Sequence, residues 1–182
     1  QKTKTRILIE TPSEEEIAAV MNGAEMQVAY RGDEDEYSWP FVVTEKNGEK
    51  CLKASNQQVD ESYAILYADV QLEAGQAVGF DYLISSELGS DVLHVIVNDE
   101  PINTISGYNE VEKWETCYPW VASEAGTYEL ALCYIKDADS SAADDTVYIK
   151  NLHISDASAI KTPTYLPRQA ATSADGFEYS YV

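Results

Sequence analysis

Apolar and polar residues alternate with a period of two along most of this chain, and this pattern constrains the fold more than any other feature. In residues 63–72, one face of an extended strand would carry only apolar side chains: Ala64, Leu66, Ala68, Val70 and Leu72. Residues 77–86 and 127–135 alternate in the same way, and 148–154 closes the series. Residues 92–97 are apolar except for His94, which predicts a strand covered on both faces.

Turn-forming residues separate these segments at short intervals. The turns are expected at residues 46–49, 73–76, 87–90, 98–101 and 123–126, each of which contains Gly, Asn or Pro. Many strands at such spacing favour an antiparallel sandwich or barrel over alternating strands and helices. The fold class we expect is therefore all-β.

One short amphipathic helix is expected before the strands. Ser13 stands three residues ahead of Glu16, the spacing of a capping box, in which the Ser hydroxyl accepts the Glu amide. Ile17, Val20 and Met21 then form one apolar stripe. Asn22 and Gly23 end the helix, because both tolerate the left-handed conformation of a C-terminal cap.

The length of 182 residues accommodates one domain and an appendage. We expect a lead-in over residues 1–12 with a short strand at 6–10, and a β-sandwich module over 13–155. After residue 155 the periodic pattern stops. Residues 156–182 are predicted to be a linker or the start of a following module.

The charge excludes two classes of partner. With 32 acidic and 12 basic residues, the chain has a net charge of −20 and would repel nucleic acid and anionic lipid headgroups. Divalent cations, basic partners and simple solvation remain as explanations of the charge. No apolar run approaches the length of a membrane span, so we expect no membrane insertion.

A collinear series of motifs resembles a known family. The matching segments are residues 20–23 (VMNG), 39–41 (WPF), 53–56 (KASN), 78–87 (VGFDYLISSE), 91–95 (DVLHV), 114–130, 134–137 (YIKD) and 145–151 (DTVYIKN). The series is similar to the MAM-like, concanavalin-type jelly-roll modules of large bacterial surface proteins, which are related to cleaved-adhesin domains.

The resemblance covers about 140 residues and implies a jelly-roll β-sandwich with one short N-terminal helix. It also implies an extracellular or cell-surface adhesion or structural accessory, whose partners are neighbouring domains of the same polypeptide and a glycan or host surface protein. One position departs from the family: Lys150 stands where members often carry an aspartate that resembles a calcium ligand, and an ammonium there would repel a cation.

Two acidic clusters are candidates for calcium, the one cofactor that the sequence suggests. Residues 33–36 are consecutive carboxylates in a predicted loop, and a second loop supplies Asp137, Asp139, Asp144 and Asp145. Calcium prefers several oxygen ligands that converge from a loop, and the second cluster suits it better. A solvated acidic loop is the competing interpretation.

No catalytic machinery is recognisable. His94 and His153 lie in predicted strands without a nucleophile motif, and no pair of carboxylates is singled out as an acid and base. The three cysteines, Cys51, Cys117 and Cys133, match no metal or redox spacing, allow at most one internal disulfide, and fit buried small hydrophobes. We therefore expect a protein that is not an enzyme.

Aromatic side chains give an alternative function. Tyr and Trp faces beside carboxylates and amides suit pyranose rings, and Tyr37, Tyr118 and Trp120 are the candidates near predicted loops. Trp39 and Trp114 match family positions that look structural. Two function classes therefore stand: an adhesion or structural module, and a carbohydrate-binding module, assisted by calcium if the acidic loop binds it.

Overall fold

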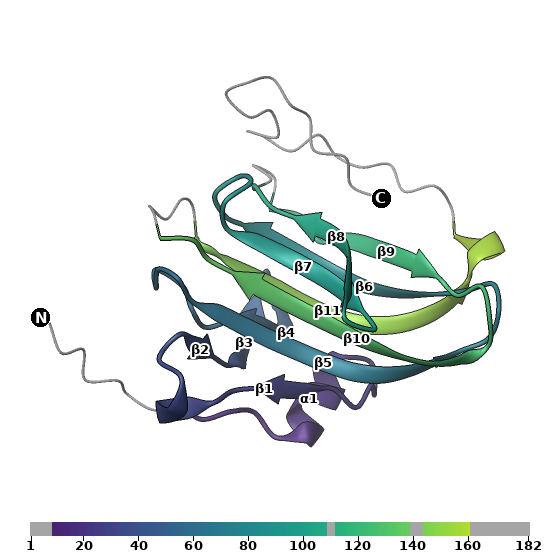
Figure 1. The fold of residues 1–182 in the computed structure, drawn as a ribbon, viewed down its shortest axis with the longest axis horizontal. Coiled ribbons are helices and arrows are strands. Elements are labelled where there is room, and N and C mark those ends of the chain that lie inside the picture. The colour runs from purple at the N-terminus through teal and green to yellow at the C-terminus, as the bar shows by residue number, and fades with distance from the viewer. Residues whose placement is uncertain (1–8, 109–111, 139–143, 161–182) are drawn as a thin grey trace, which may run out of the picture.

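The protein folds as two antiparallel β-sheets packed face to face, as seen in a computed structural model that describes residues 9–108, 112–138 and 144–160 (Figure 1). The strands of the first sheet, called the β5 sheet, are β1 (Gln27–Ala29), β5 (Tyr63–Leu72), β10 (Gly126–Ile135), β7 (Val92–Val97) and β8 (Glu100–Ile105), in that spatial order. A two-residue strand, β2 (Ser38–Trp39), pairs with β5 in parallel.

The second sheet, called the β11 sheet, has the spatial order β3 (Phe41–Lys46), β4 (Glu49–Ala54), β11 (Thr146–Asp156), β6 (Gln76–Ser85) and β9 (Glu115–Val121). Seven of the ten connections between successive strands of the described residues cross from one sheet to the other, and the β1–β2, β3–β4 and β7–β8 connections stay within a sheet. This confirms the predicted all-β sandwich with one short helix.

The helix α1 (Glu14–Val20) begins and ends where the sequence predicts. The Ser13 hydroxyl accepts the Glu16 amide at 3.2 Å, and the Gly23 amide donates to the Ala18 carbonyl at 2.7 Å. Asn22 and Gly23 have φ angles of 57° and 81°, in the left-handed region that ends a helix. Two 3₁₀ turns, Gly32–Glu34 and Ala157–Ala159, complete the helical elements of the described residues.

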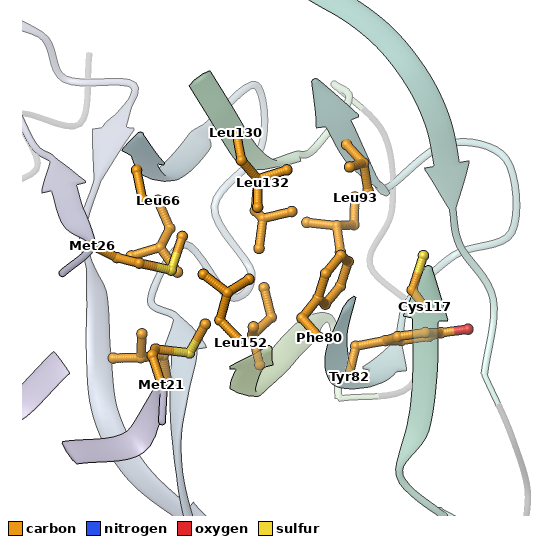
Figure 2. Close-up of a cluster of buried hydrophobic side chains, with 14 of the residues drawn as sticks. Met21, Met26, Leu66, Phe80, Tyr82, Leu93, Cys117, Leu130, Leu132 and Leu152 are labelled. Carbon is orange, nitrogen blue, oxygen red and sulfur yellow. The ribbon is translucent and has the colours of Figure 1, made fainter. Parts of the chain in front are cut away.

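The core lies between the sheets and is built from the strand faces that the alternation predicts. The five apolar residues of β5 named above are at most 7% exposed. Met21 and Met26 enter the core beside Leu66 and Leu152, as Figure 2 shows. Phe80, Tyr82 and Cys117 pack at the other end of the same cluster (Figure 2).

Hairpin turns have the local geometry that their residues favour. At the β3–β4 turn, Asn47 and Gly48 have φ angles of 53° and 77°. Two successive left-handed residues match the right-handed twist of the paired strands. Asn98 and Asp99, with φ angles of 49° and 65°, make the same kind of turn between β7 and β8.

One strand prediction needs correction, and a second lies mostly outside the described residues. β7 is covered on one face only, because His94 and Ile96 are partly exposed on the outer face of the β5 sheet. The strand expected at residues 6–10 lies mostly outside the described residues, and Ile9 and Glu10 are not in a strand.

Candidate binding groove

A groove of about 750 Å³ is lined by residues of both sheets and of the segment from α1 to β1. This volume is within the range of small-ligand pockets. Figure 1 shows α1 and β1 together on one side of the sandwich. The loop after α1 forms one wall, with Asn22, Gly23, Ala24 and Glu25. Strand β5 forms the opposite wall with residues 67–71, and β11 contributes residues 152–154.

The floor of the groove is apolar, because the inward faces of both sheets reach it. Ala68 and Val70 point inward from β5, and Met26 and Leu152 belong to the same core cluster. Ile154 extends this floor towards solvent, with 48% of its surface exposed. A ligand in the groove can therefore bury apolar groups against a surface that the fold leaves open.

The rim of the groove is acidic. Its ionised side chains are Glu14, Glu25, Asp69 and Glu129, and none of its lining residues is Lys or Arg. Asn22, Gln27 and Gln71 add amide groups to the rim, and the Tyr67 hydroxyl donates to Gln27 Oε1 at 2.5 Å. The groove thus presents hydrogen-bond acceptors and negative charge around an apolar floor.

Asp69 and Glu129 lie directly opposite each other on β5 and β10. Both side chains are exposed on the outer face of the β5 sheet, and no ion pair of the described residues involves either carboxylate. Like charges in this arrangement destabilise a sheet. Two carboxylates that repel each other, those of Asp69 and Glu129, therefore lie at the rim of the groove.

A separate cluster of charges is buried at the other end of the sandwich. The Lys136 ammonium donates to Asp91 Oδ2 at 2.9 Å and to the Asp145 carboxylate, and all three side chains are withdrawn from solvent. Burial alone would lower the pKa of Lys136, but its bonds to Asp145 and Asp91 outweigh burial, so the pKa is raised. Burial raises the pKa of Asp91 to about 6.

This buried cluster divides the predicted calcium ligands among different partners. Asp145 pairs with Lys136, while Asp144 is 45% exposed and lies 3.5 Å from the Lys46 ammonium. Asp137 groups instead with Glu87 and Asp91, and their carboxylate oxygens lie within 4.8 Å of one another. Asp139 is outside the described residues. A convergent carboxylate group therefore exists, but Asp137 is its one predicted member.

The three predicted sugar-binding aromatics do not come together. Tyr118 lies on the outer face of the β11 sheet, edge-on to the His153 ring at 5.4 Å between centroids. Trp120 packs against the core and the Tyr128 ring, because the pairing of β6 and β9 shifts between Val78 and Phe80. Tyr37, 43% exposed, stands in the loop before β2. They form no common platform.

Tyr118 is held in place by two neighbours. Its hydroxyl lies 3.0 Å from His153 Nε2, and His153 Nδ1 lies 2.9 Å from the Asn151 carbonyl. Since a carbonyl only accepts, the bond to Asn151 selects the tautomer of the neutral imidazole in which Nδ1 carries the proton, and in that tautomer Nε2 accepts from the Tyr118 hydroxyl. A side chain at Gly79 would approach Tyr118 Cε1 to 2.5 Å, so only glycine leaves room for this ring.

Lys150 also has a structural role. Its ammonium lies 3.1 Å from Glu49 Oε2 and 4.7 Å from the centre of the Trp114 ring. Trp114 in turn packs on the small outer cluster of Cys51, Leu83 and Tyr148. The lysine that departs from the family pattern thus forms an ion pair and a cation–π contact.

The remaining residues with reactive side chains, His94 and the three cysteines, lie in surroundings typical of a structural role. His94 Nδ1 lies 3.1 Å from Thr104 Oγ1, and burial lowers the pKa of this histidine. None of the three cysteines forms a disulfide, all three are buried, and burial raises the pKa of Cys51 and Cys133 to about 11. The Cys51 and Cys133 thiols are therefore protonated at neutral pH, and the burial of all three cysteines fits the predicted role as small hydrophobes.

The groove could not be predicted from the sequence. Its residues come from α1, β1, β5, β10 and β11, so no motif joins them. Ile154 gave the one usable signal, as an apolar residue at the end of the last predicted strand. Among the described residues, no helix has the length and apolar character needed to cross a membrane.

Comparison with solved structures supports the fold. A part of the secreted serine protease VesC from Vibrio cholerae superimposes with a TM-score of 0.51 and 18% identity, over 80% of this chain and 27% of VesC. The chain thus spans about a quarter of that protein. No protein-family model matches the sequence. No curated protein matches it either.

Two weaker similarities have TM-scores below 0.5. TmCBM61, solved with β-1,4-galactotriose, gives 0.46 at 18% identity, over 72% of this chain and 88% of its own. The K1 cleaved adhesin domain of Lys-gingipain from Porphyromonas gingivalis W83 gives 0.44 at 13% identity, over 71% of this chain and 89% of its own.

Proposed function

We propose that this chain is a non-catalytic, extracellular β-sandwich module of a larger bacterial surface or secreted protein, and that it serves adhesion by holding a ligand in the groove. The main support for this proposal is the shape and lining of the groove. It joins an apolar floor, including the exposed Ile154, to a rim of carboxylates and amides. A concave apolar surface with a few polar groups around it is the usual form of a binding site.

The location outside the cell and the neighbouring domains rest on the family resemblance of residues 20–151. Carbohydrate binding is the second candidate function. It is favoured by the amides of Gln27 and Gln71, which stand on the rim beside the Tyr67 ring. Amides and an aromatic ring can together bind sugar hydroxyls and C–H surfaces.

The experiment compares two variants on a panel of probes that includes a glycan array and a peptide array. Ile154→Trp fills the groove, and Val121→Trp is its control, because Val121 is 46% exposed and lies outside the groove lining. We expect probes bound by the native chain to be lost with Ile154→Trp and kept with Val121→Trp. Probe binding that is unaffected by Ile154→Trp, or absent for the native chain, would overturn the proposal.

A further inference from the structure

We infer that the groove binds an extended polypeptide with alternating apolar and basic residues, which adds a strand to the open edge of β5. The inference rests on the proposed function and names its ligand class. Three observations support it: an unpaired strand edge, the apolar floor beside that edge, and the uncompensated carboxylates on its outer face.

The edge of β5 is open beyond its short neighbour. Strand β1 pairs with β5 only at residues 65–67. In the part of the chain that the structure describes, no strand pairs with residues 68–72 on this side, while β10 covers the other side along the whole strand. An exposed edge of this kind is a template for strand addition.

Hydrogen bonds on β10 show which backbone groups of β5 face this edge. The backbone N–H of Asn98 donates to the Glu129 carbonyl at 2.9 Å, and the backbone N–H of Glu129 donates to the side-chain oxygen Oδ1 of Asn98 at 2.9 Å. Both backbone groups of Glu129 therefore point towards β7. In an antiparallel ladder, the opposite residue Asp69 must then point its own N–H and C=O away from β10, to the open edge. The direction alternates along a strand, so Gln71 does the same.

The side chains beside this edge set the sequence of the ligand. A strand added antiparallel to β5, in line with β1, would place alternate residues inward over Ala68, Val70 and the exposed Ile154. These residues should be apolar. The residues between them would lie on the outer face next to Asp69, with Glu129 one strand further away.

Charge selects basic residues at those outer positions. The rim holds four carboxylates, from Glu14, Glu25, Asp69 and Glu129, and neither Lys nor Arg lines the groove. A lysine opposite Asp69 would relieve the repulsion between Asp69 and Glu129 and form a cross-strand ion pair. A peptide uses the strand edge as well as the rim, which a sugar does not, so the peptide is the ligand that the groove favours.

The test uses an octapeptide of alternating valine and lysine, labelled for fluorescence anisotropy, and the matching valine–glutamate peptide. We expect the lysine peptide to bind and the glutamate peptide not to bind. Replacing both carboxylates in Asp69→Asn/Glu129→Gln should weaken binding at least about fivefold, since the ion pair with Asp69 and the longer-range attraction of Glu129 are both lost. The control Asp60→Asn/Glu45→Gln removes the same charge from exposed sites outside the groove and should bind normally.

Peptides methylated at chosen backbone nitrogens test strand pairing separately from charge. A residue opposite Asp69 shares its face and its hydrogen bonds, so the lysine amides, and not the valine amides, should point at β5. Methylating the lysine nitrogens of the peptide should therefore abolish binding, while methylating the valine nitrogens should leave it. The charge variant remains folded by this account, because removing two opposed carboxylates should raise its melting temperature.

Equal binding of the lysine and glutamate peptides would overturn the inference, and so would unchanged binding by the charge variant or equal effects of the two methylation patterns. If a glycan binds in the groove and is lost with Ile154→Trp, while the lysine peptide does not bind, the inference fails and the proposed function stands.

Discussion

The Lys136 ammonium lies 2.9 Å from the Asp91 carboxylate, and both side chains are fully withdrawn from solvent. Lys136 follows the end of β10, Asp91 precedes β7, and the second partner, Asp145, precedes β11. One ammonium therefore ties together three chain segments from both sheets. The backbone N–H of Gln58 also donates to Asp145 Oδ2, at 2.6 Å, which extends the network to a fourth segment.

Replacing Lys136 with methionine should destabilise the fold strongly. The variant leaves the Asp91 and Asp145 carboxylates buried without a cation, and breaking a buried pair in this way typically costs about 3–5 kcal/mol. Urea unfolding of the variant and the native chain measures the difference in their free energies of unfolding. Lys50→Met is the control, since Lys50 is exposed and should change stability by less than about 0.5 kcal/mol. Similar costs for the two variants would contradict the role of Lys136.

Asp91 should make stability depend on pH below neutrality. Burial raises its pKa to about 6 in the native state, above the ordinary value of 3.8, so the native state binds more protons than the unfolded state between these values. The stability of the native chain relative to Asp91→Asn should therefore fall as pH rises from about 4 to about 6, and then level off. Urea unfolding across this range checks the sign. A difference that rises with pH would mean that Lys136 lowers the pKa of Asp91 instead.

Alanine at Gly79 should force the Tyr118 ring out of its position. The new Cβ would come within 2.5 Å of Tyr118 Cε1 and 2.7 Å of His153 Nε2, and overpacking of this kind costs about 1–3 kcal/mol. In a Tyr118→Ala background the same substitution should cost much less. A double-mutant cycle by thermal unfolding measures the coupling. Additive costs would show that the ring does not depend on Gly79.

Calcium binding stays a prediction, and the carboxylates that converge differ from the predicted ligand set. Glu87, Asp91 and Asp137 bring three carboxylates together, and we predict that millimolar calcium raises the melting temperature by several degrees. Asp137→Asn should remove this shift. Asp144→Asn should keep it, because Asp144 lies beside Lys46 instead. An unchanged melting temperature of the native chain in calcium would exclude a site.

The alternation along β5 and the cap at Ser13 could be predicted from the sequence because both are local. Each depends on residues within a few positions, and the structure agrees with them. Trp120 could not be placed in this way. The register shift between β6 and β9 interrupts the alternation, so Tyr118 faces outward and Trp120 packs on the core.

The groove and the buried ion cluster depend on pairing between distant segments. The opposition of Asp69 and Glu129 follows from the β5–β10 register, and the register is fixed by how the whole face is buried. From the sequence alone, Lys136 would likewise be placed on the surface, as one more charged residue in a chain with a net charge of −20. Its burial becomes visible only when β10, β7 and β11 are assembled.

An NMR titration of the ¹⁵N-labelled chain with the valine–lysine octapeptide tests peptide binding in the groove residue by residue. We expect the largest amide shifts along the open edge of β5, at Asp69 and Gln71, and along residues 152–154 of β11. These shifts should be absent in Ile154→Trp. Shifts centred on Tyr118 and the outer face of the β11 sheet, or no shifts at saturating peptide, would contradict peptide binding in the groove.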